Sequence, residues 1–325
     1  MGKVSFSRLK SVSDTGYGDN FSGRFINKDG RPNVRKRGVN ILNRYSWYHT
    51  MLDLKRWQFI GMLIGSYIIA NFIFALIYYL IGIEHLTGID KSTFSNEFTD
   101  VFFFSSQTFT TVGYGRIAPV GFLASLVATF EAFLGLLAFA IATGLFYGRF
   151  CRPRAFLQFS DVALISPHKD KTALMFRMAP FKNTSLTDAG ITVLSSFEMT
   201  ENGETRSSFY TLKLEVEKIT SLILNWTIVH YIDENSPFFG LTAEDLKAID
   251  IEIIVHVKAF DSIFSSDVVQ RTSYTSAEIV YGAKFEKMYG ADESNQFTVL
   301  NLDKINSHYS TELPKLNLSD GSGIL

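Results

Sequence analysis

A run of 25 residues without a single charge constrains this chain more than any other feature of its sequence. It reads FIGMLIGSYIIANFIFALIYYLIGI and extends from Phe59 to Ile83. At about 1.5 Å per residue, a helix of this length exceeds the roughly 30 Å hydrocarbon core of a bilayer. Helices of soluble proteins seldom stay uncharged on every face for so long. The run is therefore predicted to span a membrane rather than to lie inside a soluble protein.

A second apolar run, Ile117–Tyr147, has Glu131 as the one charge in its 31 residues. It begins near Pro119, a residue suited to the first turn of a helix, and predicts a second span. Basic residues flank the pair of spans on their outer sides, at Arg44, Lys55, Arg56, Arg149, Arg152 and Arg154. By the positive-inside rule, this placement predicts a multi-pass protein of the cell (inner) membrane with both termini in the cytoplasm.

The net charge of −1 conceals a strong division along the chain. Residues 1–58 carry 12 Lys and Arg against 4 Asp and Glu, residues 59–152 carry 4 against 5, and residues 153–325 carry 15 against 23. Residues 1–40 lack apolar periodicity and are predicted to form a mostly disordered basic arm. The single cysteine, Cys151, excludes an intrachain disulfide. The sequence has no phosphate loop or nucleophile elbow, so an enzyme is not expected.

Between the two spans lies a shorter apolar stretch, Phe98–Phe109, with the sequence FTDVFFFSSQTF. A helix of this length covers about 18 Å, roughly half a membrane, so it cannot cross. It is predicted to be a re-entrant half-helix, followed by irregular backbone that is enclosed by protein or lines water. The negative end of its dipole would lie near the membrane centre, where it favours a dehydrated cation.

Aromatic and charged residues mix just before the first span, at Tyr45, Trp47, Tyr48, His49, Leu52, Asp53, Lys55, Arg56 and Trp57. The mixture predicts an amphipathic helix in the membrane interface, and an extended aromatic belt is the alternative. Lys55, Arg56, Arg152 and Arg154 are candidate contacts for anionic lipid, each worth about 1 kcal/mol. A simple topology signal would explain the same four residues.

After Pro153 the pattern changes to period-two alternation, which is typical of half-buried antiparallel strands. Candidate strands are residues 173–178, 191–197, 212–217, 222–232, 251–260 and 268–280. Asn202-Gly203 is a turn signal. A short helix is expected over residues 243–249, with Thr242 as its N-cap and Asp245 three residues on. This half of the chain is predicted to be a β-sandwich.

The segment TTVGYG, residues 110–115, follows the half-helix directly and resembles the selectivity filter of potassium channels. In such a filter the K⁺ ligands would be the carbonyl oxygens of Thr111, Val112, Gly113 and Tyr114, with the Thr111 hydroxyl as the innermost ring. Inward-pointing carbonyls require conformations that favour glycine, which accounts for Gly113 and Gly115. One chain supplies one filter strand, so a closed ring requires a homotetramer. The alternative is an incidental turn.

Four residues of the second span are candidates for a part in conduction, each with an alternative. Gly135 and Gly144 could form a hinge or permit close helix packing. Glu131 is costly in lipid, so it should face a water-filled cavity or form a structural hydrogen bond behind the filter. Tyr147 could form a narrow gate or act as an interfacial anchor.

Three stretches carry a resemblance to inwardly rectifying potassium channels, and more closely to their prokaryotic branch: FFFSSQTFTTVGYG, FEAFLGLLAFAIATGLFYGRFCRPRA and VHYIDENSPFFGLT. The resemblance implies a homotetrameric two-span α-helical pore with a re-entrant pore helix and a cytoplasmic all-β immunoglobulin-like sandwich. The expected domains are the arm over 1–40, the slide helix and pore over 41–152, the sandwich over 153–310 and a tail over 311–325.

The resemblance also implies roles for single residues. Tyr147 falls on the family's gate, and Asp261–Asp267 on the loop that narrows the cytoplasmic pore. The inner-helix acid that binds the blockers polyamine and Mg²⁺ is replaced by Phe139, so rectification is expected to be weak unless Glu131 or acidic residues of the vestibule substitute for it. Gln107 stands where a glutamate usually supports the filter, next to Thr110, and Arg116 where an acid often follows GYG.

Passive K⁺ conduction is the function that these features favour, with K⁺ as permeant ion and no cofactor or nucleic acid involved. A potassium uptake transporter subunit is the first alternative, but such chains contain several different filter repeats and this one contains a single repeat. The second alternative is a membrane-tethered β-sandwich interaction protein in which TVGYG is incidental.

Overall fold

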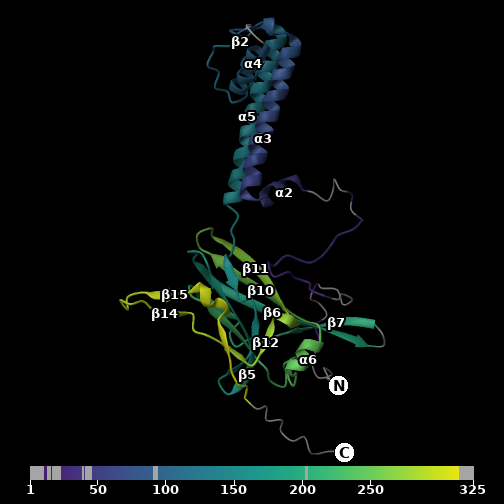
Figure 1. The fold of residues 1–325 in the computed structure, drawn as a ribbon, viewed down its shortest axis with the longest axis vertical. Helices are drawn as coiled ribbons and strands as arrows, with labels where there is room; N and C mark the ends of the chain where they lie inside the picture. Colours follow the sequence, from purple (N-terminus) through teal and green to yellow (C-terminus); the bar gives the residue numbers. More distant parts are fainter. Residues whose placement is uncertain are drawn as a thin grey trace, which may run out of the picture. The chain divides into compact units, whose positions relative to one another are not determined.

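The computed structural model describes residues 11–12, 16, 23–38, 40, 46–90, 94–201 and 204–314. The chain divides into two compact units. The helical unit comprises residues 36–152, and the β unit comprises residues 1–35 together with 153–325 (Figure 1).

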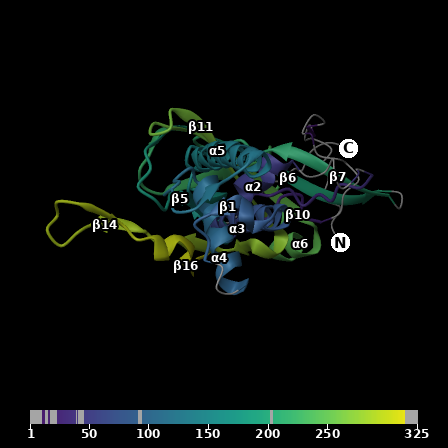
Figure 2. The same cartoon turned by 90° about the horizontal axis from the view of Figure 1, so that it is seen from above.

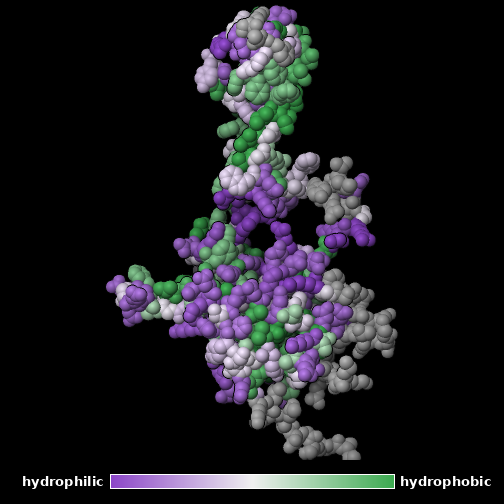
Figure 3. Space-filling model, viewed as in Figure 1, coloured by the Kyte–Doolittle hydropathy of each residue, from purple (hydrophilic) through white to green (hydrophobic). Residues whose placement is uncertain are grey.

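The described residues of the helical unit include the helices α2 (Trp47–Asp53), α3 (Arg56–Ile81), α4 (Phe94–Phe109) and α5 (Phe122–Phe150). Helices α3 and α5 are both long and apolar enough to cross a membrane, as the two apolar runs predicted. Apolar residues cover much of this unit in Figure 3, coloured green. Exposed Ile, Leu and Phe side chains on both helices suit contact with lipid or with other copies of the chain.

The second spanning helix begins later than the sequence suggested. Ala118 and Pro119 form the short strand β2, which pairs with β1 (Leu86–Thr87). Strand β1 directly follows the 3₁₀ turn η1 (Ile83–His85). Gly121, with φ +84°, then precedes the first turn of α5. The prediction of Pro119 in the first helical turn is therefore wrong, because the β1–β2 pairing holds it in extended backbone.

The β unit is a sandwich of two five-stranded sheets. The first has the order β11-β10-β6-β7, with β8 also on β6, and the second has the order β12-β4-β5-β3, with β9 also on β5. The pairings are antiparallel except β12 with β4. The strands of the first sheet are β6 (Leu186–Glu201), β7 (Glu204–Thr211), β8 (Lys218–Leu222), β10 (Ile251–Asp261) and β11 (Ser266–Thr275). Those of the second are β3 (Leu157–Phe159), β4 (Ala163–His168), β5 (Lys171–Pro180), β9 (Trp226–Tyr231) and β12 (Ile279–Tyr281).

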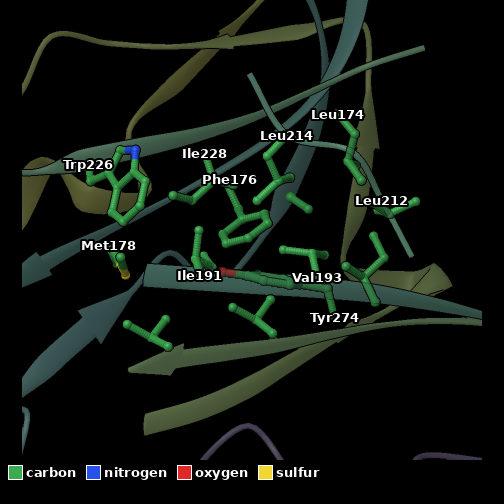
Figure 4. Close-up of a cluster of buried hydrophobic side chains, with 14 of the residues drawn as sticks. Leu174, Phe176, Met178, Ile191, Val193, Leu212, Leu214, Trp226, Ile228 and Tyr274 are labelled. Carbon is green, nitrogen blue, oxygen red and sulfur yellow. The ribbon is translucent and has the colours of Figure 1, made fainter. Parts of the chain in front are cut away.

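The core of the β unit lies between the two sheets. Phe176 and Met178 of β5 and Trp226 of β9 pack against Ile191 of β6 and Tyr274 of β11 (Figure 4). Period-two alternation places these side chains on the inner faces, and their removal from water stabilises the sandwich.

The remaining elements are short. Helix α6 (Ala243–Ala248) has Thr242 as its N-cap, with the Asp245 N–H donating to the Thr242 hydroxyl, as predicted. The 3₁₀ turns are η2 (Ser276–Glu278) and η3 (Leu302–Asn306). Two further antiparallel pairs follow: β13 (Ala283–Phe285) pairs with β16 (His308–Ser310), and β14 (Tyr289–Ala291) forms a hairpin with β15 (Thr298–Leu300), which lies between them in the chain.

Three predicted strands differ from the structure. The strand predicted over residues 222–232 is broken at residues 223–225, between the end of β8 and the start of β9. Residues 212–217 belong to no strand, because this segment crosses between the sheets: the Leu212 N–H donates to Val193 in β6 and the Glu215 N–H to Val229 in β9. Burial and exposure alternate only over residues 212–215, because Val216 is 45% exposed, and this alternation reflects the crossing. The predicted strand over residues 268–280 is interrupted by η2. The Asn202-Gly203 turn lies outside the described residues.

Part of the predicted disordered arm is ordered on the β unit. Phe25 and Ile26 are buried against Phe209 and Ile254. The backbone N–H groups of Phe25 and Ile26 donate to the Glu252 carboxylate at 2.6 and 3.0 Å. The prediction of disorder is therefore wrong for this segment, because two apolar side chains and a paired carboxylate hold it on the sheet.

Candidate functional site

The TTVGYG segment begins where α4 ends, and the backbone of the helix terminus positions it. The N–H groups of Val112 and Gly113 both donate to the carbonyl oxygen of Gln107, at 2.9 and 3.3 Å, and the Thr111 N–H donates to Thr108 at 3.0 Å. Unpaired carbonyls at a helix C-terminus need such donors. The sequence singled out Gln107 for its side chain, but the contact that holds the filter strand comes from its main chain.

Backbone conformation alternates along the same segment. Gly113 and Gly115 have φ of +52° and +81°, as the requirement for glycine predicted. Thr111 also has a positive φ, +57°, which costs a residue with a Cβ about 1–2 kcal/mol. No feature of the sequence predicts the positive φ of Thr111. Strain of this kind persists only where the surrounding contacts enforce it.

The filter side chains have little cover within one chain. Tyr114 is 79% exposed and Val112 is 52% exposed. A large aromatic side chain at membrane depth requires neighbours that one copy does not supply here. This exposure fits the closed ring of four strands that the sequence predicted.

A buried hydrogen-bond network lies behind the pore helix. Glu131 of α5 accepts from the Tyr78 hydroxyl of α3 at 2.7 Å and from the Ser105 hydroxyl of α4. The Ser105 hydroxyl also lies 3.2 Å from Asn71 Oδ1, and the Asn71 amide donates to the Tyr67 carbonyl at 2.7 Å. Glu131, Ser105 and Asn71 are fully buried. Of the two alternatives for Glu131, the structure supports the structural hydrogen bond behind the filter.

The two glycines of the second span differ sharply in their surroundings. A Cβ built on Gly135 would lie 1.8 Å from the Phe109 carbonyl oxygen, at the last residue of α4. A Cβ on Gly144 would meet nothing within 4 Å. Close packing against the pore helix is therefore the role that the structure supports for Gly135, whereas the hinge role of Gly144 stays a prediction.

A cavity of about 720 Å³ adjoins the end of the pore helix. Phe139 of α5 lines it together with Thr110, Thr111 and Gly135, opposite Tyr67 of α3. Phe139, at the position where the resemblance places a blocker-binding acid, therefore shares one cavity with the innermost filter threonine. Tyr147, the predicted gate, is 71% exposed in the single chain.

Arg116, the residue after the filter segment, pairs with Asp100 of α4, and 3.2 Å separates Arg116 Nη2 from Asp100 Oδ2. The Asp100 carboxylate also accepts from the Asp90 N–H at 3.0 Å. The segment after the filter is thus tied to the pore helix by an ion pair. The sequence flagged Arg116 as unusual but did not predict its partner.

Arg149 links α5 to the interfacial helix α2. Its guanidinium donates to the carbonyls of Met51, Leu52 and Leu54, at 3.0, 3.2 and 2.9 Å, and stacks over the Phe59 ring at 4.5 Å. It thereby caps the C-terminus of α2. The sequence does not predict this capping role, because an arginine near the end of a spanning helix does not by itself indicate one.

The four cations that are predicted to contact lipid lie at the start of α3 or shortly after the end of α5. Lys55 is the N-cap residue of α3, where its N–H donates to Gln58 Oε1 at 3.2 Å, and Arg56 is the first residue of α3. Arg152 follows α5 and pairs with Asp53, and Arg154 is exposed. Contact with lipid stays a prediction for all four.

The loop between β10 and β11 differs from the predicted acidic constriction. Asp261 is 1% exposed, and its carboxylate accepts from the backbone N–H groups of Ile263 and Phe264 at 2.9 and 3.4 Å. Asp267 pairs with Lys258 at 2.7 Å. Ile263 and Phe264 are the large apolar side chains that the loop exposes, at 67% and 41%. Asp261 therefore shapes the loop rather than projecting its charge from it.

Known protein families and relatives match both units of the chain. The model of the inward rectifier potassium channel C-terminal domain matches residues 157–322, and an ion channel model matches residues 66–150. The inward rectifier potassium channel Kirbac3.1 of Paramagnetospirillum magnetotacticum is 34% identical over 271 residues, which cover 82% of this chain and 89% of the relative. G protein-activated inward rectifier potassium channel 2 of Homo sapiens is 26% identical over 91% of this chain and 74% of the relative. ATP-sensitive inward rectifier potassium channel 12 of Gallus gallus is 28% identical over 90% of this chain and 72% of the relative. These matches confirm the resemblance, and the chain belongs to the inward rectifier potassium channel family.

Proposed function

We propose that four copies of this chain form a pore in the cell membrane that conducts K⁺ passively and selectively. The observation that carries the proposal is the TVGYG segment, which the Gln107 carbonyl holds at the end of α4. This 16-residue helix lies in the chain between the two spanning helices α3 and α5. Around a fourfold axis, the carbonyl oxygens of Thr111, Val112, Gly113 and Tyr114 would replace the hydration shell of K⁺. Both termini are expected in the cytoplasm.

Rectification by polyamine or Mg²⁺ is expected to be weak. Phe139 stands where the resemblance places an acidic side chain that binds such cations, and it lines a cavity together with Thr110 and Thr111. Glu131 does not substitute for that acid, since it is fully buried and bonded to Tyr78 and Ser105. The cavity wall therefore offers divalent and polyvalent cations an aromatic ring in place of a carboxylate.

Gating is proposed at Tyr147 and through the β unit, with anionic lipid as modulator. Arg149 makes α2 and the end of α5 move together, because its guanidinium bonds three carbonyls of the interfacial segment. A lipid that attracts Lys55, Arg56, Arg152 or Arg154 would act on the same junction. Tyr147 lies two residues before Arg149 on the helix that this junction would move.

Flux into liposomes tests the function. Purified protein should take up Rb⁺ in a Ba²⁺-sensitive manner, and uptake should not occur for Na⁺. Conduction is expected to change when anionic lipid is added, and Phe139→Asp should increase block by internal spermine at least tenfold. Equal fluxes of Na⁺ and Rb⁺ would contradict the selectivity, and a monomeric or dimeric protein in detergent would contradict the tetrameric pore.

A further inference from the structure

The cavity beside the filter segment is bounded by three helices. Its walls come from Thr110 and Thr111 just after α4, from Phe139 of α5, and from Leu63 and Ala70 of α3. Figure 1 shows α3 and α5 side by side with α4 next to their ends, and Figure 2 shows the same helices from above. With a volume of about 720 Å³, the cavity has the size of a pocket for a small organic molecule.

The wall at the end of α4 favours positive charge. Helix α4 ends at Phe109, which also lines the cavity, so the negative end of the helix dipole lies there. The Thr110 hydroxyl donates to the Ser106 carbonyl at 2.7 Å, which leaves the lone pairs of its oxygen for a cation. Among the described residues, the lining includes no Lys or Arg side chain that would repel a cation and no Asp or Glu that would pair with one.

The aromatic ring of Phe139 decides which cations the cavity can hold. It is 73% exposed in the single chain, and the negative face of such a ring attracts a cation within about 6 Å. A ring cannot replace the strong hydration of Mg²⁺ or of a primary ammonium group, whereas a quaternary ammonium group has no N–H and is weakly hydrated. Phe139 therefore favours a quaternary ammonium group over a polyamine.

The rest of the lining is apolar and has room for an alkyl chain. Leu63 and Ala70 of α3 line the cavity together with Leu136, Ala138 and Ala142 of α5. The three alanines are small, so they leave space between the two helices. Each CH₂ group that an alkyl chain buried there should tighten binding about two- to fourfold.

We propose that this cavity binds an n-alkyltrimethylammonium cation, with the head group at Phe139 below Thr111 and the alkyl chain between α3 and α5. The proposal rests on the tetrameric pore, in which four copies of the Phe139 ring surround one position on the fourfold axis. A head group at that position closes the path of K⁺ and inhibits conduction. The ligand thus combines the charge that the end of α4 favours with the apolar surface that the spanning helices supply.

The first test measures inhibition of Rb⁺ uptake into liposomes that contain the full chain. Hexyltrimethylammonium should inhibit, butyltrimethylammonium should need about fourfold or more higher concentration, and spermine should be much weaker than either. Phe139→Leu should raise the half-inhibitory concentration of hexyltrimethylammonium at least tenfold, relative to its own uninhibited uptake. The matched control is Phe133→Leu, at an exposed residue of α5 outside the cavity lining. Equal inhibition of the two variants, or inhibition that does not depend on chain length, would overturn the proposal.

A second variant keeps the shape of the site. 3,5-Difluorophenylalanine at position 139 has nearly the size of phenylalanine, but its fluorines withdraw electrons and weaken the negative ring face. Inhibition by hexyltrimethylammonium should become severalfold weaker. If inhibition stays the same, the head group does not contact this ring and the proposal fails.

Calorimetric titration of the full chain in nanodiscs, with empty nanodiscs subtracted, measures binding without conduction. One hexyltrimethylammonium should bind per four chains, because the head group lies on the axis. Four ligands per tetramer would place them in separate grooves and overturn the axial site. If the protein conducts Rb⁺ selectively but binds no ligand, this inference alone fails. If the protein is not tetrameric, the pore proposal fails and this site fails with it.

Discussion

Tyr78 donates a hydrogen bond of 2.7 Å to Glu131, and this pair joins the two spanning helices behind the pore helix. The carboxylate receives a second donor from Ser105 of α4, so all three helices of the pore meet at one buried group. A buried carboxyl group is tolerated in such a site only when its oxygens are bonded. The network therefore fixes the position of α4, and with it the start of the filter.

Tyr78→Phe should weaken the pore by removing one of these donors. The buried carboxyl group loses a partner, which costs about 1–3 kcal/mol, while the ring still packs on Phe104 at 5.1 Å. We expect a lower melting temperature of the tetramer and reduced Rb⁺ uptake at equal protein. Thr129→Val is the control, because it removes an exposed hydroxyl of α5 that donates to the Ser125 carbonyl of the same helix. Equal behaviour of the two variants would mean that the network does not support the filter.

Gly135→Ala should damage the filter through its packing. The added methyl would clash with the Phe109 carbonyl oxygen, so the last turn of α4 must shift, at a cost of about 1–3 kcal/mol. The ratio of Rb⁺ to Na⁺ uptake should fall. Gly144→Ala meets no neighbour within 4 Å and should keep the ratio. If Gly144 is a hinge, that variant changes the open probability in single-channel recording without altering selectivity.

Arg149→Lys should loosen the interfacial helix while preserving charge. A lysine ammonium cannot make the forked contact with the carbonyls of Met51, Leu52 and Leu54, which removes about 2 kcal/mol of capping. Amide hydrogen exchange in α2 should become faster, and open probability should change. Arg152→Lys retains its pairing with Asp53 and serves as the control. Unaltered exchange in α2 would show that Arg149 does not hold this helix.

Acid should destabilise the β unit through His230. Its ring bonds the Lys213 carbonyl through Nδ1 at 2.7 Å and the Ser236 hydroxyl through Nε2 at 2.8 Å, and burial lowers the pKa of His230. The Ser236 oxygen accepts from the Phe238 N–H at 3.2 Å, so it can donate to a neutral ring. Asp233 is the charged group that opposes the shift.

The sign follows from linkage. The unfolded chain protonates this histidine below about pH 6.5, whereas the folded form resists protonation to lower pH, so the stability that His230 contributes is complete above that pH. It is lost as pH falls toward the lowered folded-state pKa. Melting temperatures measured between pH 7.5 and 5 should therefore fall less steeply for His230→Gln than for the unmodified protein. His308→Gln, at an exposed ring, should follow the unmodified protein; identical slopes for all three proteins would rule out this contribution.

The sequence alone determined the parts of this protein that depend on local pattern. Long apolar runs predicted α3 and α5, and period-two alternation predicted the sandwich. Both inferences hold because burial in lipid and strand pleating act on neighbouring residues. The filter that the motif assigns to residues 111–115 stays a prediction. The same local logic failed for residues 212–217, where alternation reflects a crossing between sheets.

Only the tertiary structure decided which partner each polar side chain has. Glu131 lies 53 residues from Tyr78 along the chain, and Arg149 lies 98 residues from Met51. The ordered segment at Phe25 likewise depends on Glu252, 227 residues away. Such contacts follow from helices and sheets packing against each other, and a side chain's position in a local pattern carries no information about the distant group it will meet.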